Sequence, residues 1–261
     1  MKNLAKLTLS VLLLISVCVI FAACTTPEKV GDATLLAYEL SEDGQSYRIM
    51  GIGSFEGEKL IIPEQYEGKP VTEIYVSAFS ATGLVSVVIP ESITKIGAMA
   101  FSECTSLVEI NIPNSVKTLN HGLFSGCTSL KTVTLPESVD EVGQSIFSGC
   151  SSLKSITLPS NIKAITGQMF KGCSELESLT VPDGVEKIQI YSLRGCSSLK
   201  ALIIPDSVTV IEFKALENCS SLQILEFKGT SEAWEKIEKR KFWDAGTGNY
   251  TVKCTDKNID K

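Results

Sequence analysis

Six cysteines at a fixed spacing are the residues of this sequence best suited to chemistry. They recur every 23 residues, at Cys104, Cys127, Cys150, Cys173, Cys196 and Cys219. Thiols can bind zinc, form disulfides, act as nucleophiles or fill a core. A zinc site requires four ligands that converge tetrahedrally, and a nucleophile requires one distinctive cysteine beside a base. A regular ladder of equivalent thiols supplies neither arrangement, so we expect no metal site and no catalytic thiol.

The spacing places each thiol beside its equivalents in neighbouring coils of a repeat. Adjacent coils would bring the Cα atoms about 5 Å apart, which is within bridging range for a disulfide. However, a column packs best when every side chain has the same rotamer, and cysteine is among the most often buried residue types. The pattern therefore favours a buried, reduced cysteine column with a structural role, and neighbour-to-neighbour disulfides are the alternative.

The other residue types that carry catalysis are scattered. His121 is the only histidine, and its equivalents one repeat apart are Ala98, Gln144 and Gly167, which indicates a freely varied, exposed position. Carboxylates occupy variable positions such as Glu91, Glu137, Asp183 and Asp206. No phosphate-binding loop, nucleophile elbow or zinc-binding helix motif is present in the sequence. We therefore expect a protein without catalytic residues or cofactor.

The elements that position these residues repeat with the cysteines. Six units begin at Ile89, Ile112, Leu135, Leu158, Val181 and Ile204, each with proline as its second residue. Within one unit Val139, Val142 and Phe147 supply apolar anchors, and Leu153-x-x-Ile156-x-Leu158 has the strand spacing of leucine-rich repeats. Ile156 and Leu158 point inward and Ser155 and Thr157 outward, because side chains alternate along a strand. The sequence predicts a leucine-rich repeat solenoid, mainly β with short helical or irregular convex segments.

The units resemble the BspA-like leucine-rich repeats of bacterial surface proteins. The shared features are the apolar-Pro step, a later phenylalanine, and Cys-x-x-Leu ahead of the strand, and they extend from about residue 34 to the C-terminus. Leu193 and Leu216 depart from the pattern by replacing the phenylalanine. The resemblance implies a non-enzymatic cell-surface protein that mediates adhesion by binding host or bacterial surface proteins.

The outward strand positions form a neutral, hydroxyl-rich surface in the middle of the predicted rod. Its members are the candidate ligand face: Thr132, Thr134, Ser155, Thr157, Ser178 and Thr180. An elongated solenoid face is a common binding surface. The alternative interpretation is that these residues only have high β-propensity, since the face lacks the aromatic anchors that dominate most interfaces.

The two ends of the chain differ from the repeats. Residues 1–23 have a basic start, a short apolar run and small residues before Cys24, which predicts a secretory signal peptide. Phe21-Ala22-Ala23-Cys24 resembles the bacterial lipobox, which implies a lipoprotein signal peptide with Cys24 as the lipidated residue; the alternative is an ordinary signal cut with Cys24 incidental. Residues 24–33 would be a tether, residues 34–88 an N-terminal cap and first irregular repeat, and residues 89–227 the six repeats. Residues 228–261 would form a C-terminal cap. We expect a β-hairpin about Asp43-Gly44 in the first cap and a helix containing Trp234 in the second.

Charge narrows the possible partners. The net charge is −6, and removal of the leader, which contains two lysines and no acidic residue, makes it −8. Nucleic-acid binding needs a basic stripe, so we expect no nucleic-acid partner. We expect an exported monomer that is held at the bacterial membrane by its N-terminal lipid and binds surface proteins. A spacer module of the cell envelope without a ligand is the alternative, and an envelope enzyme acting on glycans is less favoured.

Overall fold

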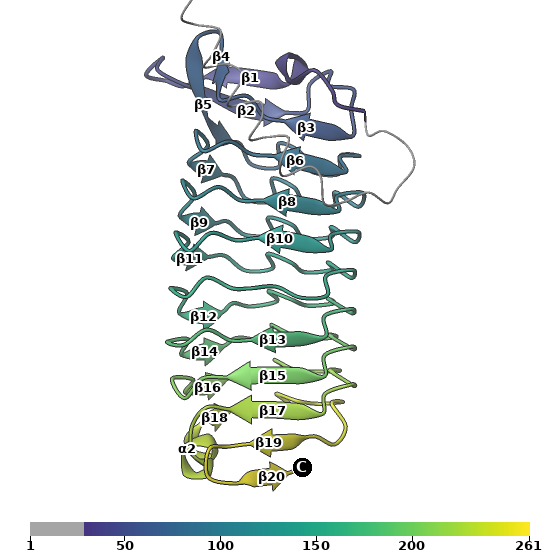
Figure 1. Ribbon diagram of the computed structural model, residues 1–261, viewed down its shortest axis with the longest axis vertical. Helices are drawn as coiled ribbons and strands as arrows, with labels where there is room; N and C mark the ends of the chain where they lie inside the picture. The colour runs from purple at the N-terminus through teal and green to yellow at the C-terminus, as the bar shows by residue number, and fades with distance from the viewer. Residues whose placement is uncertain (1–28) are drawn as a thin grey trace, which may run out of the picture.

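Short parallel strands stack coil upon coil and build a rod, shown with its long axis vertical in Figure 1. The computed structural model describes residues 29–261. One long side of the rod, here called the strand wall, contains β3 (Lys59–Ile61), β6 (Ser86–Val88), β8 (Glu109–Asn111), β10 (Thr132–Thr134), β13 (Ser178–Thr180), β15 (Ala201–Ile204), β17 (Ile224–Phe227) and β19 (Thr251–Lys253). Neighbours in the wall pair in parallel, with Glu109 beside Thr132 and Ser178 beside Ala201.

A second wall of shorter strands follows the proline of each unit. It contains β5 (Lys69–Ile74), β7 (Lys95–Ile96), β9 (Thr118–Leu119), β11 (Glu141–Val142), β12 (Ala164–Ile165), β14 (Lys187–Ile188), β16 (Val210–Ile211) and β18 (Glu238–Lys239). Turns complete each coil, and the helical elements of the described chain are η1 (Ala33–Leu35) and α2 (Ser231–Lys236). The mainly-β solenoid is therefore confirmed, and its convex segments consist of turns.

Phenylalanine rings fill the interior behind the two walls. Phe79, Phe101, Phe124, Phe147 and Phe170 are fully buried, and successive rings stack with centroids 5.4, 5.9, 5.7 and 5.7 Å apart. Leu193 and Leu216 continue this column and are also fully buried. Each coil thus closes the apolar face of its neighbour, which is why a single unit could not be stable alone.

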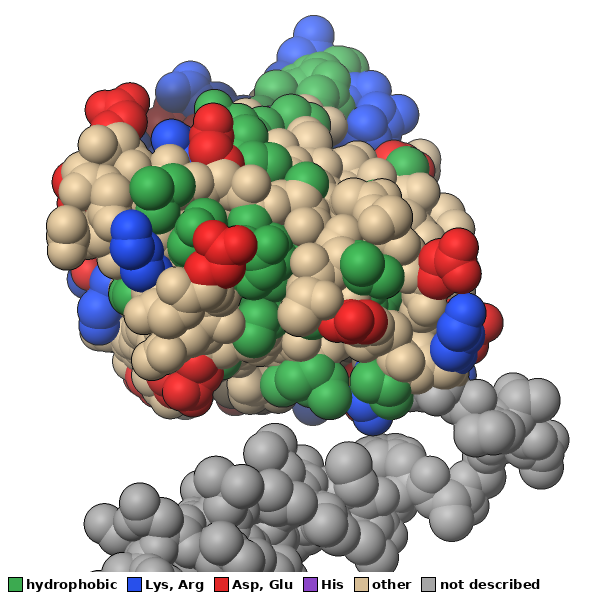
Figure 2. Space-filling view, turned by 90° about the horizontal axis from the view of Figure 1, so that it is seen from above, with side chains coloured by type: hydrophobic (Ala, Val, Ile, Leu, Met, Phe, Trp, Pro, Cys, Tyr) green, Lys and Arg blue, Asp and Glu red, His purple; other side chains and the backbone are tan. Residues whose placement is uncertain are grey.

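The N-terminal hairpin covers the first end of the rod. β1 (Ala37–Leu40) and β2 (Tyr47–Gly51) pair antiparallel around a turn in which Gly44 has φ of 68°, and β2 continues in parallel onto β5 of the second wall. β4 (Gln65–Tyr66) pairs antiparallel with β5. Seen down the rod from this end, hydrophobic side chains are scattered over the face among polar and charged ones (Figure 2).

Residues that precede the hairpin in the sequence already form backbone hydrogen bonds with the solenoid. The backbone N–H of Glu58 donates to the carbonyl of Lys29 at 2.9 Å, and Gly31 donates to Lys59 at 3.2 Å. Residues 29–31, the end of the predicted tether, therefore lie against β3. The leader and Cys24 lie outside the described residues.

The C-terminal segment closes the other end. The Thr230 hydroxyl accepts a hydrogen bond from the Ala233 N–H at 3.2 Å and so caps α2, as expected for threonine at this position. Trp234 of α2 is buried against Phe227 and Trp243, with ring centroids 5.4 and 6.1 Å apart. β19 adds a parallel strand to the strand wall, and β20 (Asn258–Asp260) pairs antiparallel with it. The two caps thus extend the walls as well as covering them.

Both walls are interrupted between the same two coils in the middle of the rod, and the second wall has a further break between β7 and β9. Residues 155–157 form no strand, so the strand wall consists of one sheet ending at β10 and another beginning at β13. In the second wall, β11 pairs with β9 and β12 with β14, but β11 and β12 are not paired. The sequence predicts a strand at 155–157, and the structure differs there.

The side chains around this interruption give a physical reason for it. Val133, Leu135 and Val142 of one coil and Ile156 of the next are only partly buried, whereas their equivalents in most other coils are buried. Val133 stands where the preceding coil has Ile110, and Val142 where it has Leu119. Shorter side chains fill the space between the coils less completely, and even a small gap removes much of the van der Waals attraction between them. The strands of these two coils are therefore held less firmly together.

Candidate ligand-binding face

The six residues of the candidate ligand face are all exposed on the strand wall. Thr132 and Thr134 project from β10, Ser178 and Thr180 from β13, and Ser155 and Thr157 from the unpaired segment between them. Strand alternation aims the intervening residue, such as Leu179, into the core. The structure thus brings the six hydroxyls together on one side of the rod, in three successive coils.

The neighbours of the six hydroxyls differ towards the two ends. The parallel register places Thr134 beside Asn111 and Thr180 beside Ile203. Further along the same columns, Ile61 and Val88 near the N-terminal end are 47% and 40% exposed. Glu109 and Asn111 of β8 therefore separate the uncharged middle of the wall from the exposed Val88 and Ile61.

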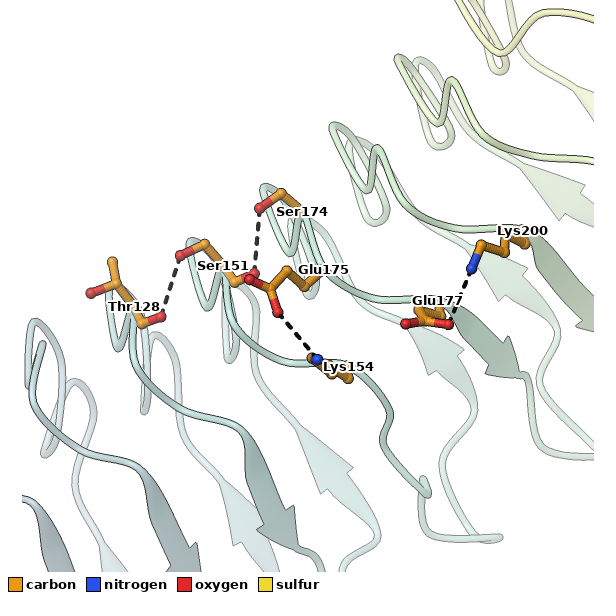
Figure 3. Close-up of polar contacts among 7 residues, drawn as sticks. All are labelled: Thr128, Ser151, Lys154, Ser174, Glu175, Glu177 and Lys200. Atoms are coloured by element: carbon orange, nitrogen blue, oxygen red, sulfur yellow. Dashed lines mark hydrogen bonds and ion pairs between the residues drawn. The ribbon is translucent and has the colours of Figure 1, made fainter. Parts of the chain in front are cut away.

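A polar ridge borders the face on the side where the strands begin (Figure 3). The Ser151 hydroxyl donates to the Thr128 carbonyl at 3.3 Å, and the Ser174 hydroxyl donates to the Ser151 carbonyl at 3.3 Å. Each of these residues directly follows a column cysteine. The ridge links one coil to the next and fixes the edge from which the strands start.

Ion pairs between coils lie beside this ridge. Lys154 is 4.0 Å from Glu175, and Lys200 is 3.2 Å from Glu177. All four side chains are more than half exposed, so the pairs contribute little to stability. Their effect is to place both signs of charge along one border of an otherwise uncharged face.

Carboxylates border the opposite side, where each unit turns after its proline. Glu91 accepts hydrogen bonds from the backbone N–H groups of Asn114 and Ser115 at 3.3 and 3.1 Å. Glu137 accepts from the backbone N–H and hydroxyl of Ser160 at 2.9 and 2.8 Å, and these bonds lower the pKa of the Glu137 carboxyl. These acids bind the turn of the next coil, which is a structural use of the carboxylate.

The remaining candidates for chemistry do not form a catalytic constellation. Asp183 forms an ion pair with Lys228 at 2.9 Å, and Asp206 and His121 are exposed. Among residues 29–261, no group of three or more histidine, cysteine or acidic side chains could hold a metal ion. An open hollow of about 570 Å³ lies beside the N-terminal hairpin and is lined by polar residues such as Arg48, Glu73 and Lys95.

The six column cysteines are buried free thiols joined to the phenylalanine column by hydrogen bonds. Cys127 Sγ donates to the Phe101 carbonyl at 3.0 Å, and Cys150 Sγ donates to the Phe124 carbonyl at 3.1 Å. The same bond recurs from Cys104, Cys173, Cys196 and Cys219, each to the phenylalanine or leucine carbonyl of the preceding coil. The thiol hydrogen thus satisfies a buried carbonyl, which the sequence spacing alone did not reveal.

Burial controls the chemistry of the thiols in the middle of the column. It raises the pKa of Cys150 to about 12 and the pKa of Cys173 well above its ordinary value. A thiol must ionise to act as a nucleophile, so buried neutral cysteines are inert. Cys254, outside the column, is only partly buried.

Within residues 29–261, no helix has the length and apolar character that crossing a bilayer requires. The predicted membrane attachment rests on Cys24, which lies outside the described residues.

Comparisons with known proteins agree with this geometry. The model of the BspA type leucine-rich repeat region matches residues 72–200 and 165–261, in six copies. The crystal structure of a leucine-rich repeat protein from T. pallidum is similar with a TM-score of 0.65 and 29% identity, covering 81% of this chain and 97% of that one. A leucine-rich repeat protein from Bacteroides ovatus has the same fold, with a TM-score of 0.60 and 19% identity over 90% of this chain and 77% of that one. No curated protein sequence matches the chain.

Proposed function

The chain belongs to the family of BspA-type leucine-rich repeat proteins, and from this premise we propose that it is a non-enzymatic, exported surface protein that binds other proteins. The family resemblance supports adhesion to host or bacterial surface proteins as the biological role. The observation that carries the proposal for this chain is the candidate ligand face, where six exposed hydroxyls lie together on an elongated sheet surface.

The surface around these hydroxyls suits a protein ligand of moderate affinity. The face is uncharged and its borders carry both acids and bases, so a partner can pair with charges at the rim while its backbone and side chains contact the hydroxyls. No aromatic side chain lies among the six. We therefore expect binding through many small contacts over a long surface rather than through one anchoring residue.

Anchorage at the membrane is the second part of the proposal. The Ala22-Ala23-Cys24 sequence supports cleavage before Cys24 and lipidation of its thiol. Expression with a labelled fatty acid should label the wild-type chain and leave Cys24→Ala unlabelled and released from the membrane fraction. Equal labelling of both chains would contradict lipidation at Cys24.

The binding test uses lysine at the three threonines of one column. Thr134→Lys/Thr157→Lys/Thr180→Lys adds bulk and charge at the centre of the face without touching the core. Wild-type protein should bind immobilised extracellular-matrix proteins or whole cells, and the variant should lose most of that binding in a plate assay. A matched control, Gln144→Lys/Gln168→Lys, places lysines on the turns behind the second wall and should bind as wild type does.

Two outcomes would favour other functions. If the pure wild-type chain binds no matrix protein and no cell surface, the spacer function without a ligand is the better account. If the pure chain hydrolyses a polysaccharide, the non-enzymatic proposal fails.

A further inference from the structure

Three aromatic side chains form a second surface cluster, away from the candidate ligand face. Tyr191, Phe213 and Phe242 lie on the turns that follow β14, β16 and β18, in three successive coils. Tyr191 and Phe213 meet edge to face with ring centroids 5.8 Å apart, and Phe213 and Phe242 do so at 6.3 Å. Phe242 is 53% exposed and the adjoining Ile190 is 38% exposed. These rings therefore present apolar surface to solvent.

Each ring also has a cation over it. The Arg194 guanidinium lies 5.2 Å from the Tyr191 ring centroid, and Lys214 Nζ lies 5.4 Å from that of Phe213. Lys241 Nζ lies 5.0 Å from the Phe242 centroid. We call these six residues, Tyr191, Arg194, Phe213, Lys214, Lys241 and Phe242, the aromatic–cation ladder.

The ladder carries a local excess of positive charge on an acidic chain. Glu217, which is buried, accepts both Arg194 at 2.5 Å and Lys214 at 2.6 Å. Glu212, which precedes Phe213, accepts the Ile190 N–H at 2.9 Å. Lys241 has no ion pair within residues 29–261, in a sequence whose net charge is −6. Charge complementarity therefore points to an anionic partner.

The turn that carries the ladder has the same backbone conformation in the other coils. Tyr191, Lys214 and Phe242 have φ of 56°, 53° and 59°, and the equivalent residues Met99, Gly122, Ser145 and Gln168 have φ of 55°, 63°, 59° and 57°. The positive φ is therefore a feature of the repeat, and the ladder is distinguished by its rings and cations.

We propose that the aromatic–cation ladder is a second binding surface, which takes an acidic segment of a partner protein. Carboxylates of the segment would pair with Lys241 and with the outer N–H groups of Arg194 and Lys214. Apolar or aromatic side chains of the segment would pack between the three rings. Aromatic residues and arginine are the types enriched at the centres of protein interfaces. Three cations are too few for the extended basic stripe that nucleic acid requires.

The test uses a synthetic acidic polypeptide as the probe. A random copolymer of glutamate and tyrosine supplies both carboxylates and rings, polyglutamate supplies only the charge, and polylysine has the opposite charge. Titration calorimetry at low salt should show binding to the copolymer, weaker binding to polyglutamate and none to polylysine. Tyr191→Gln/Phe213→Gln/Phe242→Gln should weaken copolymer binding by about tenfold or more, which is the scale of losing hot-spot residues.

The variants are chosen so that a folding defect cannot imitate the result. Glutamine already stands at the equivalents Gln168 and Gln144, so these turns accept it. Lys241→Glu removes a cation that has no ion pair and should weaken binding several-fold without changing the thermal midpoint. Thr134→Gln/Thr157→Gln/Thr180→Gln, on the candidate ligand face, should bind the copolymer as wild type does.

Several results would overturn the assignment. Equal copolymer affinity for wild type and both ladder variants would show that the ladder is not the binding surface. Equal loss of binding in the threonine control would place the binding on the candidate ligand face. Tighter, ladder-dependent binding of heparin than of the copolymer would replace the acidic polypeptide by an anionic glycan.

Discussion

The column of phenylalanines and cysteines continues through the middle of the rod, whereas the strands beside it do not. Between Phe124 and Phe170 the rings keep their spacing of 5.7 Å, and the Cys150 and Cys173 thiols keep their hydrogen bonds. Over the same coils, residues 155–157 form no strand, and β11 and β12 do not pair with each other. The regular column and the backbone hydrogen bonds of the turns, such as that from the Phe147 N–H to the Met169 carbonyl at 2.9 Å, therefore hold this part of the solenoid together.

The difference shows which interactions fix the repeat. The column combines a large buried ring with a thiol that satisfies a carbonyl of the preceding coil, so each residue has a specific partner. A short strand depends on apolar side chains of sufficient length beneath it. Between the coil of Val133 and Val142, which are only partly buried, and the coil that follows, strand pairing is lost while the column persists.

Removing one ring from the middle of the column should have the largest effect. Phe147 is fully buried between Phe124 and Phe170, so Phe147→Ala leaves a cavity in the part of the rod where the strands contribute least. We expect the free energy of unfolding to fall by about 3–5 kcal/mol. Chemical denaturation followed by circular dichroism measures it.

The matched control is Phe147→Leu, because leucine fills the same position at Leu193 and Leu216. It should cost clearly less than alanine. An alanine variant that loses less than about 1 kcal/mol, well below the usual cost of a buried aromatic, would show that the column does not hold the middle of the rod.

The buried thiols should make stability depend on alkaline pH. The folded protein keeps Cys150 protonated up to its raised pKa of about 12, whereas the unfolded chain ionises near the ordinary value of 9. The unfolded state therefore binds fewer protons above pH 9, and stability falls as pH rises from there towards 12. Each such thiol should lower the free energy of unfolding by about 1.4 kcal/mol per pH unit in this range.

A difference measurement isolates the thiols from the tyrosines and lysines, which also titrate there. Cys150→Ala/Cys173→Ala should lose less stability between pH 9 and pH 10 than wild type, by about 2–3 kcal/mol. Identical pH dependence in the two proteins would mean that these thiols ionise as easily in the folded state as in the unfolded one. Thiol titration adds a second measurement, with column cysteines slow to react when folded and free after denaturation.

Longer side chains at the interruption should restore strand pairing there, so that the walls become as regular as the column. Val133→Ile/Val142→Ile restores the isoleucine found at Ile110 and Ile165. We expect the free energy of unfolding to rise by about 1–2 kcal/mol, the reverse of a pair of isoleucine-to-valine truncations. Hydrogen exchange at residues 155–157 should slow, since strand pairing protects amides.

Strain from overpacking is the opposing possibility for this variant. Unchanged exchange at residues 155–157 together with lower stability would show that the coils are already in full contact. As a control, Val139→Ile adds the same methylene at a position that is already fully buried, and it should be neutral or destabilising.

The sequence predicted the parts of this molecule that repeat and missed those that depend on small differences between repeats. The 23-residue period identifies the inward residues, the prolines and the cysteine column, because every coil places them in the same environment. The interruption at residues 155–157 goes with incomplete burial of Val133, Val142 and Ile156, which the pattern of apolar residues does not record. The hydrogen bond from Cys150 to Phe124 also depends on geometry between coils, which spacing alone does not define.

Of the two candidate binding surfaces, the sequence likewise predicted the one that follows the repeat and missed the other. Alternation along the strands correctly exposes Thr134 and Thr180, although their role in binding stays a prediction. The aromatic–cation ladder was missed because Tyr191, Phe213 and Phe242 do not share one repeat position. The chain brings them together through neighbouring positions in successive turns.

A buried hydroxyl beside the column allows a further test of how regular the column is. Ser192 is fully buried beside Leu193, where other coils have Leu123, Ile146 or Met169, and its hydroxyl has no hydrogen-bond partner within residues 29–261. Burying an unpaired hydroxyl costs free energy, so Ser192→Ala should stabilise the protein by about 1 kcal/mol. Ser145→Ala, at a half-buried turn position, is the control and should have little effect. A loss of stability in Ser192→Ala would mean that the hydroxyl is satisfied in solution, in which case the column has no such defect and is as uniform in its polar groups as in its rings.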